Sequence, residues 1–184
     1  MPTYDLSAIA DQLAAHRIPG SPLVVALDGP SGAGKSRLSR RIAKALGPST
    51  VVRMDHVVPG WDGLEESVRL IRPVLARLRA GRPATYRTWD WARDGWGAEL
   101  HRSPAGTVVL EGCGSGARSL ADLVDALVWV EAPPQLRRDR AIERDGPSYA
   151  ANWARWARQE EAHFAANATR ERADVIIDGR YPVR

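Results

Sequence analysis

Apolar residues in this chain follow two alternating patterns, short continuous runs and longer stretches with helical periodicity. The short runs are bounded by turn residues and cover 23–27, 51–54, 107–110, 126–130 and 175–177. Runs that are apolar throughout, rather than at every second position, are typical of strands covered on both faces, as in a parallel sheet. The pattern therefore predicts five strands of one buried sheet.

The stretches between these runs predict helices. They cover residues 35–46, 64–79, 135–144 and about 149–169, and an amphipathic helix is also expected within residues 1–20. Because strand and helix alternate, we expect an α/β fold with right-handed crossovers. Two segments rich in Pro, Gly and Trp, 59–63 and 81–97, interrupt the alternation. We interpret both as loops around a ligand site, since such folds bind ligands beyond the carboxyl ends of their strands.

Composition narrows the classes of protein to which the chain can belong. Its 184 residues are 44% hydrophobic, which suits one well-buried core, so we predict a single domain over 1–184. Cys113 is the one cysteine and excludes an intrachain disulfide. A net charge of +4 without an isolated basic run argues against a nucleic-acid partner. Since no apolar run approaches the span of a bilayer, we expect a cytoplasmic protein without a membrane partner. Its oligomeric state stays open.

Residues 29–36 read Gly-Pro-Ser-Gly-Ala-Gly-Lys-Ser and fit the phosphate-loop pattern G-x-x-x-x-G-K-[ST]. They follow the first predicted strand and open a predicted helix, so backbone N–H groups and the helix start can converge on phosphate oxygens. Lys35 is expected at the β- and γ-phosphates and Ser36 at Mg²⁺. We therefore predict ATP and Mg²⁺ as cofactors, held by Gly29, Ser31, Gly32, Ala33, Gly34, Lys35, Ser36 and Arg37. The loop alone does not separate a kinase from an ATPase or a GTPase.

Two acidic residues at predicted strand ends are candidates for chemistry. Transfer of phosphate to a hydroxyl needs a carboxylate that accepts the proton, and Asp55 is the best-placed candidate, with a turn or magnesium-shell role as the alternative. Glu111 is expected on the magnesium side as a Walker-B acid, or else as a strand-end cap.

Three arginines after residues 133–134 are spaced so that they share one helix face. Arg137, Arg140 and Arg144 can close over the phosphates as a lid spanning 134–148, or they can form a salt-bridged surface helix. Within the lid interpretation, Arg137 and Arg140 are placed at the transferred group.

The order of these features resembles the uridine kinase family, and more distantly the phosphoribulokinases and pantothenate kinases. The matching stations are Asp55, Trp61-Asp62-Gly63, Trp89-Asp90-Trp91, Leu110-Glu111-Gly112, the run 128–131 before the arginines, and the run 173–177. The resemblance covers about residues 23–178 and implies a three-layer P-loop NTPase fold, with a central five-stranded, mostly parallel sheet flanked by helices. It also implies transfer of the γ-phosphoryl group of Mg-ATP to a small alcohol, with a nucleoside as first choice.

The tryptophan-rich segments are expected to form the acceptor pocket, because an indole face can stack on a planar base. With Asp55, we place Trp61, Asp62, Trp89, Asp90 and Arg93 at the acceptor, while Trp153 and Trp156 are expected on a core-facing stripe and Cys113 as a small loop residue.

The acceptor and the class of function have alternatives. The chain departs from the family pattern at 56–59 and has a short lid exit at 144–147. The phosphate loop also resembles that of cytidylate kinases, so a nucleoside monophosphate is the nearer alternative, with Arg87, Arg93 and Arg118 available for its phosphate. A regulatory P-loop ATPase that acts on a protein partner is the alternative of another class.

Overall fold

Five strands form the central sheet of the computed structural model, which describes residues 3–184. The strands are β1 (Leu23–Asp28), β2 (Ser49–Arg53), β5 (Thr107–Glu111), β6 (Ala126–Glu131) and β7 (Val175–Asp178), in the order β2-β5-β1-β6-β7. Every pairing in this sheet is parallel. Each predicted apolar run overlaps one of these strands, although Met54 at the end of the second run lies in a short 3-10 helix. Strands β1 and β5 are buried along their whole length, as continuous apolar runs require.

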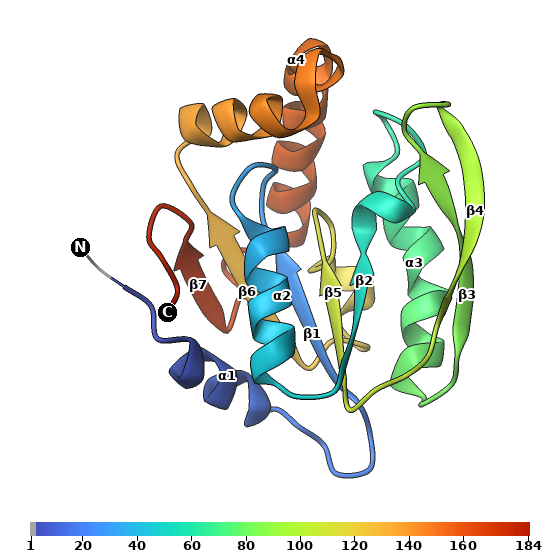
Figure 1. Ribbon diagram of the computed structural model, residues 1–184, viewed down its shortest axis with the longest axis vertical. Coiled ribbons are helices and arrows are strands. Elements are labelled where there is room, and N and C mark those ends of the chain that lie inside the picture. Colours follow the sequence, from blue (N-terminus) through green and yellow to red (C-terminus); the bar gives the residue numbers. More distant parts are fainter. Residues whose placement is uncertain (1–2) are drawn as a thin grey trace.

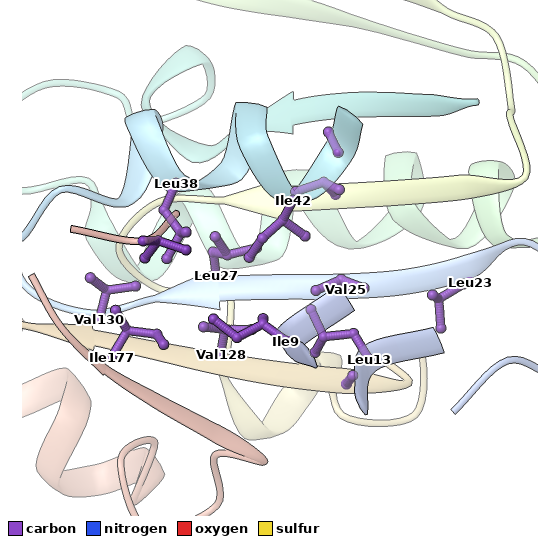
Figure 2. Close-up of a cluster of buried hydrophobic side chains, with 14 of the residues drawn as sticks. Ile9, Leu13, Leu23, Val25, Leu27, Leu38, Ile42, Val128, Val130 and Ile177 are labelled. Atoms are coloured by element: carbon purple, nitrogen blue, oxygen red, sulfur yellow. The ribbon is translucent and has the colours of Figure 1, made fainter. Parts of the chain in front are cut away.

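Successive side chains of the strands feed two hydrophobic cores, one on each face of the sheet. On one face, Val25 and Leu27 pack with Ile42 of α2 (Lys35–Ala45) and Leu13 of α1 (Leu6–Ala14), as Figure 2 shows. On the other face, Val24 and the strands beside it pack with the apolar side of α3 (Leu64–Arg79). The two covered faces confirm the predicted three layers (Figure 1).

The last helix, α4 (Pro134–Asn167), changes direction at Gly146, whose backbone angles are φ 74° and ψ −157°. Glycine alone enters that region readily, so Gly146 allows the helix to break. The two helices predicted for 135–144 and 149–169 correspond to the parts of α4 before and after this break. The first half crosses above the carboxyl ends of the strands, and the second half descends beside the sheet (Figure 1). The first half therefore lies at the end of the sheet where ligands bind in folds of this kind.

The segment 81–97, predicted as a loop, is largely an antiparallel hairpin, so that prediction is wrong. Strands β3 (Ala84–Asp90) and β4 (Gly95–Arg102) pair with each other and lie beside α3 (Figure 1). The hairpin has one covered face, where Ala84 and Tyr86 are buried and alternate with exposed residues. A strand that alternates between buried and exposed residues contains few apolar residues, and the glycines of this segment made it resemble a loop.

No helix in the described part of the chain is both long and apolar enough to cross a bilayer.

Candidate functional site

The loop 29–36 joins the carboxyl end of β1 to α2, and neighbouring backbone confines it from behind. Gly29, Gly32 and Gly34 have φ values of 137°, 78° and 106°. A Cβ atom on Gly29 would lie 2.0 Å from the carbonyl oxygen of Val130, and one on Gly32 would lie 2.1 Å from that of Arg137. A Cβ on Gly34 would meet nothing within 4 Å. The first two glycines are therefore required by close contact with β6 and α4, and Gly34 by its backbone angle alone.

A buried carboxylate that the sequence analysis did not single out fixes the start of the loop. Asp28 accepts hydrogen bonds from the backbone N–H groups of Gly29 at 2.7 Å, Gly114 at 3.0 Å and Gly116 at 2.8 Å. It therefore ties the phosphate loop to the loop after β5. Burial raises the pKa of Asp28, while the hydrogen bonds from Gly116 and Gly29 act against the increase. The available signal was a lone acid at the end of a fully apolar strand.

The side chains predicted to hold phosphate and metal lie next to one another. Lys35 is 7% exposed, and its Nζ donates to the carbonyl oxygens of Gly29 at 2.5 Å and Pro30 at 3.0 Å. Ser36 donates to Glu111 Oε2 at 3.2 Å. Burial raises the pKa of Glu111, and Lys35 is the leading influence that lowers it. A hydroxyl and a carboxylate supply the oxygen donors that Mg²⁺ prefers, so these residues fit that ion.

A cavity of about 510 Å³ opens in front of the loop. Its wall includes loop residues, the end of β2, the hairpin tip and the second half of α4. The lining residues are Ser31, Lys35, Ser36, Arg53, Met54, Asp55, Val58, Trp61, Trp91, Ala92, Glu111, Gly112, Cys113, Arg144, Asp145, Ser148, Tyr149 and Trp156. The predicted residues Ser31, Lys35, Ser36, Asp55, Trp61 and Glu111 thus share one space.

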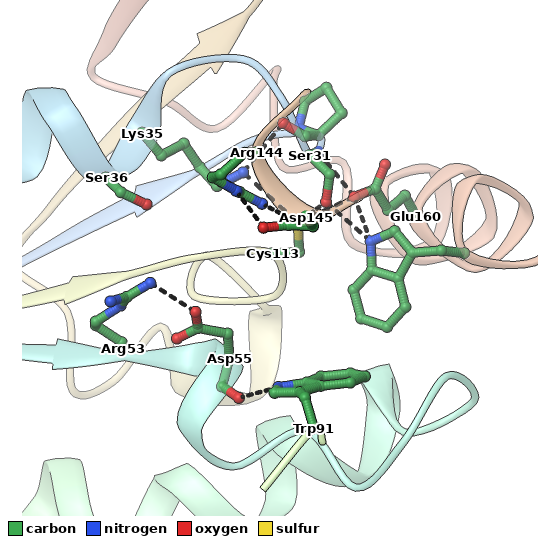
Figure 3. A network of polar contacts seen from close by, with 12 residues as sticks. Ser31, Lys35, Ser36, Arg53, Asp55, Trp91, Cys113, Arg144, Asp145 and Glu160 are labelled. Atoms are coloured by element: carbon green, nitrogen blue, oxygen red, sulfur yellow. Dashed lines mark hydrogen bonds and ion pairs between the residues drawn. The ribbon is translucent and has the colours of Figure 1, made fainter. Parts of the chain in front are cut away.

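Aromatic rings from separate parts of the chain form one side of this cavity. Trp61 is the centre of the group, with ring centroids 5.1 Å from Trp91, 5.2 Å from Tyr149 and 6.4 Å from Trp156. Trp91 comes from the hairpin tip, and its Nε1 donates to the backbone oxygen of Asp55 at 3.1 Å (Figure 3). The hairpin therefore closes the cavity beside the predicted base.

Charged groups in the cavity wall are paired with each other. Arg53 contacts the carboxylate of Asp55 at 2.7 Å and that of Glu111 at 3.3 Å. Arg144 holds Asp145 through contacts of 2.8 and 2.6 Å (Figure 3). With Lys35, the described lining therefore carries three cations and three carboxylates.

The lid arginines divide between the cavity and the backbone. Arg144 lines the cavity, whereas Arg137 donates to the carbonyl oxygens of Ala132 at 3.0 Å and Ser31 at 3.2 Å. Arg140 donates to the carbonyl oxygen of Gly179 at 3.1 Å. The other predicted loop residues, Gly29, Gly32, Ala33 and Gly34, form the loop backbone, and Arg37 is exposed on α2.

Four residues predicted at the acceptor do not line the cavity. Asp62 is paired with Arg155 at the surface. Trp89 packs edge-on against Trp96, with ring centroids 5.3 Å apart. Asp90 accepts from the backbone N–H groups of residues 92 and 93 in the hairpin turn, and the side chain of Arg93 is 88% exposed. For the three hairpin residues, Trp89, Asp90 and Arg93, the turn accounts for this outcome, because it brings Trp91 and Ala92 to the cavity instead.

A second buried carboxylate that the sequence analysis did not single out contacts the loop from α4. Glu160 is 3% exposed and accepts from Ser31 N at 2.8 Å, Trp156 Nε1 at 2.7 Å and Cys113 Sγ at 3.1 Å. Trp156, expected on a core-facing stripe, is buried and also lines the cavity. The available signal was the spacing of four between Trp156 and Glu160, which places them on one helix face.

Comparison with known proteins identifies a family. The model of the family described as AAA domain matches residues 25–166. That range includes the phosphate loop, the hairpin and nearly all of α4. No curated protein sequence matches the chain.

Solved structures share the fold over almost the whole chain. A protein from Bacillus stearothermophilus, described as a possible uridine kinase, has a TM-score of 0.69 and 18% identity, covering 94% of this chain and 97% of its own. A protein from Silicibacter sp. TM1040, assigned as a fructose transport system kinase, has a TM-score of 0.64 and 24% identity, with 97% and 98% covered. D-glycerate 3-kinase from Cryptococcus neoformans has a TM-score of 0.56 and 16% identity, with 89% and 86% covered. The fold is therefore the one these P-loop proteins share.

Proposed function

Because the chain belongs to the AAA domain family, we propose that it is a P-loop kinase that transfers the γ-phosphoryl group of Mg-ATP to a hydroxyl group of a small acceptor, with a nucleoside as first choice. One observation carries the proposal: a single cavity contains Lys35 and Ser36, the carboxylate of Asp55 and a cluster of aromatic rings. Both a phosphate donor and a ring-bearing acceptor can thus reach the same space. The kinase descriptions of the structures with the same fold support it.

On the donor side, the chain supplies hydrogen-bond donors and charge. In this proposal loop N–H groups other than those of Gly29 and Ser31, which Asp28 and Glu160 hold, bind the phosphate oxygens, and Lys35 exchanges its carbonyl partners for those oxygens. Ser36 and Glu111 would hold Mg²⁺, which would supply positive charge to offset the negative charge that develops during transfer. Arg144 is the lid arginine in the cavity. Arg137 and Arg140, predicted at the phosphates, are assigned instead to shaping the loop and the turn at Gly179, since they hold carbonyl oxygens there.

On the acceptor side, Asp55 is assigned as the general base. The acceptor oxygen forms a bond to the γ-phosphorus, the bond from that phosphorus to the bridging oxygen breaks, and the hydroxyl proton passes to the Asp55 carboxylate. ADP leaves with the electron pair of the broken bond. Arg53 at 2.7 Å fixes the position of this carboxylate, and Trp91 anchors the backbone beside it.

The paired charges favour a neutral acceptor over a monophosphate. Each described arginine in the wall already contacts a carboxylate, so an acceptor phosphate would have to compete with an existing, partly exposed pair. Arg87, considered for that phosphate, donates to the backbone oxygen of Trp96 at 3.0 Å, and neither it nor Arg93 nor Arg118 lines the cavity. The aromatic wall suits a planar base. We extend the proposal to a cytoplasmic location, where ATP is available and a lone thiol stays reduced.

The test is ADP formation by the purified protein with Mg-ATP and a panel of nucleosides, nucleoside monophosphates, sugars and other alcohols, with products identified by mass. We expect stimulation by uridine or cytidine. We also expect Asp55→Asn to lower kcat by roughly 10²- to 10⁴-fold, the usual contribution of a general base. Stimulation by a monophosphate would replace the acceptor assignment. Slow ATP hydrolysis that responds to no acceptor would contradict the kinase proposal and favour a regulatory ATPase.

A further inference from the structure

Helix α4 holds Ser31 of the phosphate loop at three points. The N–H group of Ser31 donates to Glu160 Oε1 at 2.8 Å, and its carbonyl oxygen accepts from Arg137 at 3.2 Å. Its hydroxyl oxygen accepts from Trp156 Nε1 at 2.9 Å. Figure 3 shows Ser31 and Glu160 on facing sides of this network. Arg137 lies before the break at Gly146 and the other two residues lie after it, so both halves of α4 contact one loop residue.

Glu160 is an unusual neighbour for an anion-binding loop. A buried carboxylate beside phosphate oxygens opposes their binding by like charge, and burial of an ion is costly unless donors surround it. Here three donors converge on Oε1, and Arg137 lies 3.8 Å from Oε2. The carboxylate is therefore a fully hydrogen-bonded part of the contact between α4 and the phosphate loop.

The network determines where the proton of the Ser31 hydroxyl can point. Trp156 Nε1 lies within hydrogen-bonding distance of both Glu160 and the Ser31 oxygen, so it occupies an acceptor position of that hydroxyl. The remaining neighbours of the hydroxyl are the Cys113 sulfur at 3.5 Å, a weak acceptor, and the Tyr149 hydroxyl. Both belong to the cavity wall. The hydrogen of the Ser31 hydroxyl is therefore directed to the cavity side, where a phosphoryl oxygen would replace Tyr149 or Cys113 as its acceptor.

We propose that Glu160 is a positioning residue, which acts through Trp156 and the Ser31 N–H group to hold the Ser31 hydroxyl as a donor to the transferred phosphoryl group. The inference rests on the proposed kinase function. A donor aimed at the transferred group stabilises charge that develops during transfer, and it adds little to the binding of a product that lacks that group. Turnover and ADP affinity should therefore respond differently to its loss.

The test is a double-mutant cycle between Glu160 and Ser31, measured as kcat with Mg-ATP and as the Kd of Mg-ADP. We expect Glu160→Ala and Ser31→Ala each to lower kcat by about 10- to 100-fold, the usual range for loss of one well-placed donor. The Kd of Mg-ADP should stay within about threefold of wild type, and the double variant should be within about threefold of Ser31→Ala. The matched control is Glu161→Gln, an exposed neighbour on the same helix, which should match the wild type.

Several results would overturn the inference. Multiplicative losses in the double variant would mean that Glu160 does not act through Ser31, and so would a kcat of Glu160→Ala close to wild type. An ADP Kd that rises as much as kcat falls would indicate a purely structural contact. If the wild-type protein transferred phosphate to no acceptor, the proposed function itself would be contradicted. This result is distinguishable from failure of the positioning role, in which the wild type is active.

Milder variants keep the test informative if Glu160→Ala does not fold. Glu160→Gln retains an oxygen in place of Oε1 and should recover kcat to within about fivefold of wild type, since neutral hydrogen bonds are weaker than charged ones. Trp156→Phe keeps an aromatic ring but removes the shared N–H, and should lower kcat without a matching rise in the ADP Kd. Equal losses in kcat and ADP affinity for both variants would refute the positioning role.

Discussion

Replacing Gly29 by alanine should distort the phosphate loop through a clash with the backbone of β6, on the side away from the ligand. The added Cβ would lie 2.0 Å from the carbonyl oxygen of Val130. Ordinary contact begins near 3.4 Å, so the loop or β6 must retreat by about 1.4 Å. Such overpacking costs about 1–3 kcal/mol, and alanine at a φ of 137° adds about 1–2 kcal/mol of backbone strain. We therefore expect the free energy of unfolding to fall by about 2–5 kcal/mol.

Gly34→Ala separates the two contributions. Its φ is 106°, yet a Cβ there meets nothing within 4 Å, so only the backbone cost of about 1–2 kcal/mol should appear. Urea denaturation of both variants measures the difference. Gly29→Ala should also weaken Mg-ADP by about tenfold or more, because displacement of Gly29 disturbs its hydrogen bonds to Asp28 and Lys35. Equal unfolding free energies for the two variants would refute the argument from close backbone contact.

Four further predictions concern Glu111, Cys113 and Asp62. Because the folded pKa of Glu111 is raised, its contribution to stability is complete below its unfolded pKa and is lost as pH rises through the folded value. Wild type should thus lose more thermal stability than Glu111→Gln across that window, and its Mg²⁺ affinity should increase there; parallel pH profiles of Tm would contradict this. Glu111→Gln should also lower turnover sharply while the affinity for ADP is retained. Unchanged turnover in this variant would remove Glu111 from the site. Burial, together with Glu160, raises the pKa of Cys113, so iodoacetamide should modify this thiol slowly and Glu160→Gln should accelerate the reaction, as followed by mass spectrometry; an unchanged rate would count against their contact. Asp62→Asn should leave kcat, the acceptor KM and the unfolding midpoint unchanged, since its ion pair is exposed, whereas a large rise in KM would place Asp62 at the acceptor.

The fold was largely predictable because its strands are continuous apolar runs. The same rule missed the hairpin, in which Tyr86 and Ala84 face a core while their neighbours face water. The phosphate loop was predictable because its residues are contiguous, so their spacing alone defines the backbone geometry.

Residues that reach the site from a distance could not be found in this way. A helical pattern shows which residues share a face, but it does not show whether that face meets a core, a cavity or a backbone carbonyl. Trp156 was therefore expected only on a core-facing stripe, and Glu160 was not singled out. Likewise Arg137, Arg140 and Arg144 share a spacing, yet contacts with carbonyl oxygens engage the first two and leave the third in the cavity.

Helix α4 supplies both the side chains that contact the phosphate loop and part of the wall of the acceptor cavity. Glu160 and Arg137 contact Ser31, while Tyr149 and Trp156 line the aromatic side of the cavity. An acceptor that rests against Trp156 therefore acts on the same residue that holds Ser31. Under the proposed function, the two substrates should bind with a coupling free energy, and by thermodynamic linkage each would strengthen the other by the same factor. Such synergy would make the occupancy of the site by ATP rise with the concentration of the acceptor.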